Sequence, residues 1–392
     1  MAGDSWQSAG LTNFYCELRS VDCGLLRRTP LDANWILFIA TFALSLGLTP
    51  LFRQIALRSN FLDSPAGQLK KHTAPVPYLG GLAIYFSFLM GILGVLILAQ
   101  PADAPRVLAI LAGGTVVALM GLADDLFSLS PAVKFFFEIL AAVLLILFGV
   151  QLEFLPSHPF LAWVLTVLWV VGVTNAVNLI DIMDGLAGGV SVIACLGFVL
   201  VPFLGAQSYV HLTAAALGGG VLGFLPYNYQ PARIYMGDSG ALFLGFVLAG
   251  IAMGHGYTQV NIVALCAPLL ILGVPLYDTA LVMTLRFLKG RSMFRGSNDH
   301  LALRLRALGL SVKQVTGLLW SLSILLAACA GFLVRLSEKR ALVFMMAFSC
   351  LALFFTLAVS NIRIDEGKQV KESPFRIFLD KSTSPKKRTK KR

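Results

Sequence analysis

The stretch VLAILAGGTVVALMGLADD occupies residues 107–125 and carries no charge until it closes on two adjacent aspartates. Continuous apolar runs of about 20 residues, the length that crosses a bilayer core as a helix, recur along almost the whole chain. Of the 392 residues, 57% are hydrophobic and only 13% are charged, which a water-soluble protein could not cover with polar surface. The sequence therefore predicts an all-α, polytopic integral membrane protein.

Eleven such runs are bounded by polar, proline or glycine clusters. The ninth is long enough to tilt or break. The predicted spans are 35–52, 78–99, 107–122, 132–150, 160–177, 187–205, 211–229, 239–256, 260–285, 315–334 and 341–360.

The loops between these spans fall into two alternating sets, and one set holds 24 of the 31 lysines and arginines. Because cytoplasmic loops carry the excess of positive charge, this set is predicted to be cytoplasmic. The N-terminus is then outside, and the C-terminus is inside. Residues 1–33 form an extracytoplasmic segment, 34–361 the transmembrane catalytic domain, and 362–392 a basic cytoplasmic tail that we expect to be disordered.

The formal charge of +11 does not indicate a nucleic-acid partner, because a membrane protein needs basic loops to fix its orientation. No nucleic acid is therefore expected.

Five aspartates lie at the ends of three predicted spans. In the charge-derived topology all five face the cytoplasm, although none of them was used to set it. Aspartate is costly at membrane depth, so such a group requires a function. The five are Asp124, Asp125, Asp181, Asp184 and Asp238.

The adjacent pair Asp124 and Asp125 indicates a hard divalent cation, since two neighbouring carboxylates cannot both stay ionised cheaply in a low dielectric. Mg²⁺ favours oxygen ligands and is usually held by one or two carboxylates plus substrate phosphates. A solvated loop end also carries such pairs, and this alternative is weakened here by Asp238.

Polar side chains recur at every third residue in Asn175, Asn178, Asp181 and Asp184, and so follow one helical stripe. Amides and carboxylates of this kind can bind a nucleobase, a ribose or a sugar. The alternative is an interhelical hydrogen-bond seam, especially for Asn175.

Cations flank this set in two loops. Lys70 and His72 precede a rigid proline- and glycine-containing turn, and the loop 286–313 contains His300 and Arg304. Phosphate is their natural partner, although lysines beside a membrane are also ordinary topology signals.

Four ordered blocks complete the pattern: KKHTAPVPYLGG at 70–81, GLADDL at 121–126, NAVNLIDIMDGLAG at 175–188 and YNYQPARIYMGDSGALFLG at 227–245. In these blocks the chain resembles the polyprenyl-phosphate N-acetylhexosamine-1-phosphate transferases, which include the phospho-N-acetylmuramoyl-pentapeptide transferase. The resemblance covers roughly residues 60–310.

The resemblance implies transfer of a sugar 1-phosphate from a UDP-sugar to a membrane polyprenyl phosphate such as undecaprenyl phosphate, with release of UMP. The product, a lipid diphosphate sugar, would initiate cell-envelope glycan synthesis at the cytoplasmic face of the inner (plasma) membrane. Mg²⁺ or Mn²⁺ is the implied cofactor, and the implied catalytic residues are Asp124, Asp125, Asp181 and Asp238.

Within this set, the resemblance implies that Asp238 is the metal ligand and that Asp124, with Asp125 beside it, deprotonates the lipid phosphate. The metal site is thus predicted at Asp238, Asp124 and Asp125. By position, the resemblance implies nucleotide-site roles for Asn178, Asp184 and Asn228, stacking on uracil for Tyr235, and phosphate contacts for Lys70, His72 and Lys134. The predicted substrate-binding residues also include Asn175, His300 and Arg304.

The loop around His300 departs from the family pattern, because Ala302 and Leu303 stand where further histidines are expected. Arg304 is predicted to contact the diphosphate or sugar instead. The missing histidines favour a smaller sugar than the muramoyl pentapeptide, namely N-acetylglucosamine, with the muramoyl-pentapeptide or another amino-sugar phosphate as the alternative.

A cation-coupled transporter is the competing class. Its carboxylates would lie near the bilayer midplane rather than at one face, and the ordered blocks have no role in transport. The sequence does not define the oligomeric state, so a homodimer stays open.

Overall fold

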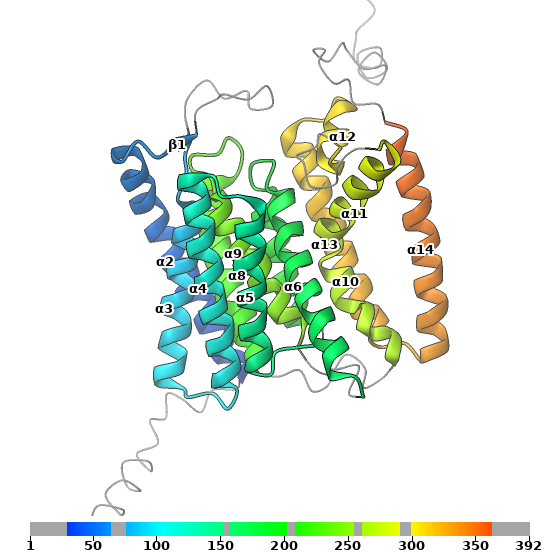
Figure 1. Cartoon of the computed structure of the whole chain (residues 1–392), viewed down its shortest axis with the longest axis horizontal. Helices are drawn as coiled ribbons and strands as arrows, with labels where there is room; N and C mark the ends of the chain where they lie inside the picture. The colour runs from blue at the N-terminus through cyan, green and yellow to red at the C-terminus, as the bar shows by residue number, and fades with distance from the viewer. Residues whose placement is uncertain are drawn as a thin grey trace, which may run out of the picture.

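The computed structural model describes residues 30–63, 76–152, 157–201, 208–254, 261–290 and 299–362, and these ranges are mostly helical (Figure 1). The helices are α2 (Pro30–Arg58), α3 (Gly80–Leu98), α4 (Ala104–Phe127), α5 (Pro131–Leu147), α6 (Pro159–Ile180), α7 (Leu186–Leu200), α8 (Ser208–Asn228), α9 (Gly237–Ala252), η2 (Ile262–Cys266), α10 (Ala267–Ile271), α11 (Gly273–Leu288), α12 (Leu301–Ala307), α13 (Val312–Leu333) and α14 (Glu338–Ser360).

Strands are confined, in these ranges, to β1 (Leu62–Asp63) and β2 (Val76–Pro77), which pair antiparallel. The predicted helical class is therefore confirmed, with one short ladder that the sequence did not indicate.

Among the described residues, seven helices are long and apolar enough to cross a membrane, and the number is eight if the bent pair of η2–α10 and α11 is one span. The chain is thus a multi-pass membrane protein. Three of the predicted spans correspond to shorter helices, α5, α7 and α9, with 17, 15 and 16 residues.

The ninth predicted span, which is long enough to tilt or break, is broken in the structure, because Ile262–Ile271 and Gly273–Leu288 meet at an angle of 82°. Pro275 lies in the first turn of α11. Since proline has no N–H and its ring clashes with the preceding turn, it allows a helix to begin here but not to continue through.

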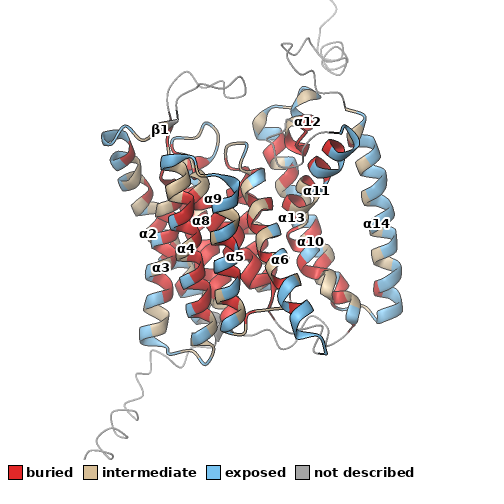
Figure 2. Cartoon of the chain, in the orientation of Figure 1, coloured by how far each residue is buried: buried red, intermediate tan, exposed pale blue. Residues whose placement is uncertain are grey.

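Helix α9 forms the centre of the bundle, and every residue from Ser239 to Ala252 is buried. It packs against α4, α6 and α3 (Figure 2). Helix α14 is the opposite case, since only Ala341 and Val359 are buried in it. Its large apolar side chains face outward, as expected for a helix whose solvent is lipid.

Helices α2 and α8 approach closely because glycines of α8 face the α2 backbone. A Cβ atom on Gly219 would lie 2.2 Å from the carbonyl oxygen of Phe38, and one on Gly223 would lie 2.3 Å from that of Phe42. This spacing of two small residues four positions apart is typical of packed membrane helices.

Successive helices run up and down, so that alternate helix ends meet. The C-terminal ends of α4, α6 and α8 lie together with the N-terminal ends of α5, α7 and α9 at the upper end in Figure 1. This end of the bundle, with α12 beside it, is called the site end below.

Candidate active site

The centre of the site end is a lysine that bridges two aspartates from different helices. The Nζ atom of Lys134, in the first turn of α5, contacts Asp124 Oδ2 at the end of α4 and lies 2.8 Å from Asp238 Oδ2 at the start of α9. Asp124 also accepts a 2.7 Å hydrogen bond from the Leu129 amide, which fixes its other oxygen. Residues 114 positions apart in the sequence, Asp124 and Asp238, are thus held on one ammonium group.

Asp125 points to the other side and caps α9. Its Oδ1 accepts from the Asp238 amide at 2.8 Å, and its Oδ2 accepts from the Ser239 amide at 3.1 Å. The first amides of a helix have no intrahelical acceptor and carry a partial positive charge. The carboxylate of Asp125 therefore stabilises the helix start that presents Asp238.

Glycines make this close approach sterically feasible. Gly237 has φ +74°, and a Cβ there would lie 2.7 Å from Asp125 Oδ2. A Cβ on Gly81 would lie 2.3 Å from the Gly240 nitrogen. The start of α9 is therefore packed directly against α3 and α4, with no room for side chains.

The donor set fits a hard divalent cation that also binds substrate oxygens. Asp124 and Asp238 present one oxygen each to a single point, now taken by the Lys134 ammonium. Within the described ranges, no group of three or more His, Cys, Asp or Glu side chains could hold a metal ion. Mg²⁺ commonly takes only one or two carboxylates and completes its shell with water and phosphate. Asp125, the third predicted ligand, already uses both oxygens in capping α9.

The turn between α6 and α7 is bound to the loop between α8 and α9. Asp184 Oδ2 accepts from the Ala232 amide at 3.0 Å. Asn228 is buried and holds both segments, since its Oδ1 accepts from the Gly185 amide at 3.0 Å and its Nδ2 donates to the Ile234 carbonyl at 3.1 Å. Asp184 and Asn228, which were predicted to bind the nucleotide, therefore hydrogen-bond the α6–α7 turn to the α8–α9 loop.

Asp181 and Asn178 lie half-buried at the end of α6, near this turn. The Asn178 side chain makes no hydrogen bond to the part of the chain that the structure describes. Its amide therefore has no partner among these residues, and its predicted contact with the nucleotide sugar stays a prediction.

Asn175 forms the interhelical hydrogen bond that was the alternative to a ligand contact. Its Nδ2 donates to Glu138 Oε2 at 2.6 Å and to the Val171 carbonyl at 2.9 Å. Glu138 is 1% exposed and lies one helical turn after Lys134 on α5. Asn175 therefore connects α6 to the helix that carries Lys134.

Tyr235 lies beside Tyr78, with ring centroids 6.0 Å apart and planes tilted by 52°. The Tyr235 amide donates to the Pro77 carbonyl at 2.8 Å, and the Tyr235 carbonyl accepts from the Gly80 amide at 2.9 Å. These bonds attach the loop before α9 to the β2–α3 connection, so an aromatic pair stands at the site end.

His300 is paired with a carboxylate that the sequence reasoning missed. Its Nδ1 lies 2.7 Å from Asp278 Oδ2 on α11, and both residues are buried. Asp278 Oδ1 accepts from the Leu301 amide at 2.6 Å. Asp278 and Leu301 also line a small cavity with Ile180 and Leu186, which brings the start of α12 against the α6–α7 turn.

Arg304 is not directed toward Asp124 and Asp238. It is 2% exposed, and its guanidinium bonds to Asp299 and to carbonyls at the end of α14. The prediction that Arg304 contacts the diphosphate is therefore disfavoured by its position. Lys70 and His72 lie outside the described residues, so their prediction is unchanged.

Sequence signals existed for the missed residues. Asp278 lies within the predicted span 260–285, and Glu138 follows Lys134 by four residues within another span. Both are ionisable groups at membrane depth, where such residues are costly and therefore indicate a function.

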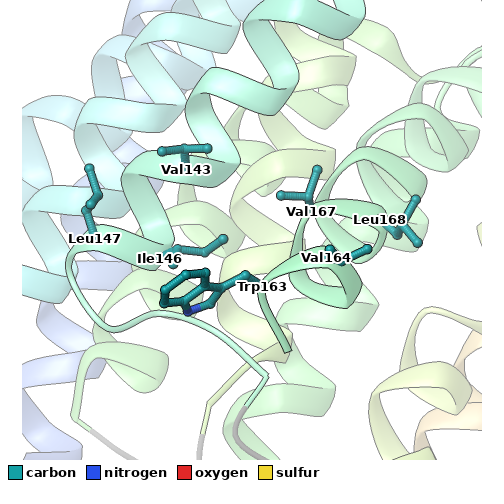
Figure 3. A pocket seen from close by; sticks show the side chains of 7 residues that line it. All are labelled: Val143, Ile146, Leu147, Trp163, Val164, Val167 and Leu168. Atoms are coloured by element: carbon teal, nitrogen blue, oxygen red, sulfur yellow. The ribbon is translucent and has the colours of Figure 1, made fainter. Parts of the chain in front are cut away.

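An apolar groove of about 440 Å³ lies between α5 and α6, away from the carboxylates (Figure 3). It is lined by Val143, Ile146, Leu147, Trp163, Val164, Val167 and Leu168. With no charged group in its lining, it cannot bind phosphate, and a lipid chain is the natural occupant of such a surface.

The fold defines a class, the multi-pass helical membrane proteins, and within it the site end carries a lysine-bridged carboxylate pair. Comparisons with known proteins identify the family. The model described as glycosyl transferase family 4 matches residues 107–255.

Several relatives extend this match. The chain is 34% identical over 320 residues to the "Probable undecaprenyl-phosphate N-acetylglucosaminyl 1-phosphate transferase" of Bacillus subtilis (strain 168), covering 78% of this chain and 86% of that protein. It is 30% identical over 286 residues to the "Decaprenyl-phosphate N-acetylglucosaminephosphotransferase" of Mycobacterium leprae, covering 64% and 71%. It is 33% identical over 298 residues to the "Phospho-N-acetylmuramoyl-pentapeptide-transferase" of Moorella thermoacetica, covering 70% and 88%.

The chain belongs to glycosyl transferase family 4. The predicted resemblance is thereby confirmed, and the chain is a membrane enzyme of the glycosyl-1-phosphate transferase type.

Proposed function

We propose that the enzyme transfers N-acetylglucosamine 1-phosphate from UDP-N-acetylglucosamine to undecaprenyl phosphate. An oxygen of the lipid phosphate attacks the sugar-linked phosphorus of the UDP-sugar, the diphosphate P–O bond breaks, and UMP leaves. The product is a lipid diphosphate sugar that starts the synthesis of a cell-envelope glycan.

The observation that carries this proposal is the convergence of Asp124, Asp238 and Lys134 from three helices at the site end. Attack of one phosphate anion on another requires positioning and charge neutralisation more than covalent assistance. The Lys134 ammonium can bind phosphate oxygens, and the Asp124 carboxylate can take the proton of the lipid phosphate.

Asp124 and Asp238 would hold a Mg²⁺ or Mn²⁺ ion. Such an ion would supply positive charge to neutralise phosphate oxygens. Asp125 would stabilise the start of α9, which carries Asp238, by accepting from its first amides. We expect Asn178 to contact the nucleotide sugar and Tyr235 to stack on the uracil ring, as the family resemblance implies.

The loop charges support a cytoplasmic location. With the eleven spans predicted from the sequence and the N-terminus outside, the site end would lie at the cytoplasmic face of the plasma membrane. The lipid substrate reaches the same end through the bilayer. This topology is supported by the helix directions in Figure 1, in which the start of α2 and the end of α14 lie at opposite ends of the bundle.

The test uses purified full-length protein with radiolabelled UDP-N-acetylglucosamine, undecaprenyl phosphate and Mg²⁺. We expect lipid-soluble label and UMP in equal amounts. UDP-N-acetylmuramoyl pentapeptide in a parallel reaction distinguishes the two relatives' sugars, and we expect no lipid product from it. Failure with every UDP-amino sugar would refute the proposed function.

A further inference from the structure

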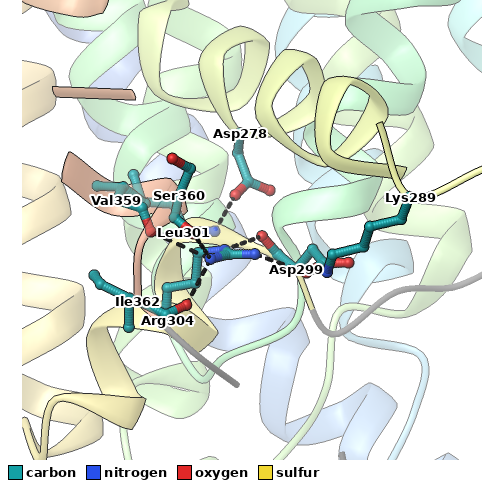
Figure 4. A network of polar contacts seen from close by, with 8 residues as sticks. All are labelled: Asp278, Lys289, Asp299, Leu301, Arg304, Val359, Ser360 and Ile362. Carbon is teal, nitrogen blue, oxygen red and sulfur yellow. Dashed lines mark hydrogen bonds and ion pairs between the residues drawn. The ribbon is translucent and has the colours of Figure 1, made fainter. Parts of the chain in front are cut away.

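A buried guanidinium joins the start of α12 to the end of α14 (Figure 4). Arg304 Nη1 donates to the carbonyl oxygens of Val359, Ser360 and Ile362 at 3.2, 3.3 and 2.8 Å. The last carbonyls of a helix have no intrahelical donor and carry a partial negative charge. The positively charged Arg304 side chain therefore supplies hydrogen-bond donors to the last carbonyls of the 23-residue helix α14.

The other face of the same guanidinium binds Asp299. Arg304 Nε donates to the Asp299 carbonyl at 3.1 Å, and Nη2 donates to Asp299 Oδ1 at 2.7 Å. Lys289 Nζ, at the end of α11, lies 2.7 Å from the same Oδ1 atom. Asp299 is 5% exposed, so its carboxylate is held between two cations with little access to water.

The residue after Asp299 is His300, whose Nδ1 faces Asp278. With Asp278 accepting from both the imidazole and the Leu301 amide, the start of α12 is fixed to α11 on one side and to α14 on the other. When Nδ1–H is bound by a carboxylate, the second ring nitrogen is the one left for a ligand.

The other attachments of α14 to the described residues are mostly apolar, such as the contacts of Phe355 with Tyr277 and of Phe344 with Phe332. Within the described residues, the middle of this helix, from Met346 to Leu351, is exposed or half-buried throughout. Beside the Arg304 contacts, Tyr277 Oη lies 3.0 Å from Thr356 Oγ1. The polar attachment of α14 is thus concentrated at the site end, next to His300.

We propose that Arg304 is a positioning residue that anchors the Asp299–His300 segment to the end of α14, and so holds His300 in the orientation needed for sugar-phosphate transfer. This inference rests on the proposed function. Arg304 then has an indirect role in place of the expected contact with the diphosphate. In this role it fixes the Asp299–His300 segment to α14.

The experiment is a double-mutant cycle in the full-length chain, with Arg304→Gln, His300→Gln and the double variant. Arg304→Gln should lower kcat about 10- to 100-fold, the scale of a small misplacement, and change KM for the nucleotide sugar by less than about threefold. When His300 is already glutamine, Arg304→Gln should lower kcat by less than about twofold further. The reason is that Arg304 is inferred to act only by orienting His300.

Arg306→Gln is the matched control. Arg306 lies on the same helix, is exposed, and donates only to the Leu310 carbonyl among the described residues, so its loss should leave kcat within about twofold of native. Arg304→Lys keeps the charge but not the fork of donors, and we expect an intermediate kcat from a chain that still folds.

Hydrogen exchange measured on the same proteins separates this inference from the proposed function. Arg304→Gln should speed amide exchange in both 299–303 and 355–362, and Arg306→Gln in neither. Additive losses in the cycle, a rise in KM with native kcat, or unchanged exchange in 355–362 would overturn the inference. Absence of transfer by the native chain would instead overturn the proposed function, while the exchange result still decides whether Arg304 anchors α14.

Discussion

Lys134 is the residue on which the candidate site depends most directly. Two carboxylates that face one point repel each other unless a cation lies between them, and the Lys134 ammonium contacts both Asp124 and Asp238. The same ammonium can pass to a phosphate oxygen when substrate binds. Lys134 would thus keep the pair converged and then help to neutralise the transferred group.

Replacing Lys134 by glutamine should therefore lower kcat by about 100-fold or more, the cost of removing one preorganised charged donor. Steady-state transfer assays measure the change. Lys313→Gln, which removes an exposed lysine at the start of α13, is the control and should keep the native rate. A Lys134→Gln enzyme as active as the control would remove Lys134 from the site.

At the scale of elements, the start of α9 depends on a carboxylate from α4. Asp125→Ala leaves two helix-start amides without their acceptor, which should cost about 0.5–2 kcal/mol of stability. Asp125→Asn keeps an acceptor oxygen and should cost less. Thermal unfolding in detergent gives the order of the two variants.

The Mg²⁺ dependence of the same two variants tests the role of Asp125 as a metal ligand. A capping residue should leave the Mg²⁺ concentration for half-maximal activity nearly equal in Asp125→Asn and native enzyme. If instead both variants need much more Mg²⁺ and unfold at the native temperature, Asp125 is a metal ligand rather than a cap.

The contact between α3 and α9 is a second element whose geometry can be tested. Gly81→Ala places a methyl group 2.3 Å from the Gly240 nitrogen, so one backbone must shift, with a cost of about 1–3 kcal/mol. Gly94, on the same helix α3, has open space around it, and Gly94→Ala should be neutral or slightly stabilising. Equal unfolding temperatures for the two variants would contradict this packing.

At the scale of the whole molecule, the alternating helix directions require the two ends of the bundle to face opposite sides of the membrane. A Ser130→Cys variant at the site end should react with a membrane-impermeant thiol reagent only after permeabilisation. A Ser337→Cys variant at the other end should react in intact cells, above the background of the native cysteines. The reverse pattern would invert the topology.

The sequence predicted most of the architecture because lipid imposes strong rules on it. Apolar runs located the helices, and the length of the ninth span indicated that it would tilt or break. The structure has an 82° bend there. Helix lengths were less accurate. The sequence had suggested full spans where α7 and α9 have 15 and 16 residues, because apolar composition does not mark where a buried helix ends.

Part of the candidate site could be grouped from the sequence, but its contacts could not. Asp124 and Asp238 could be grouped from topology, and the structure brings them onto one lysine. Roles that depend on direction were beyond the sequence: the capping by Asp125, the loop contacts of Asn228, and the burial of Arg304. A side chain at a helix end can face substrate or a neighbouring helix, and only tertiary packing decides between them.

The central claim is that Asp124 and Asp238 form the catalytic centre, and the most direct measurement is UMP release by purified Asp124→Asn and Asp238→Asn enzymes with both substrates and Mg²⁺. Asp103→Asn, at the opposite end of α4, is the control. We predict that both site variants unfold at the native temperature but lose about 10²- to 10⁴-fold in rate, while Asp103→Asn stays within about twofold of native. A native rate in either site variant would contradict the claim.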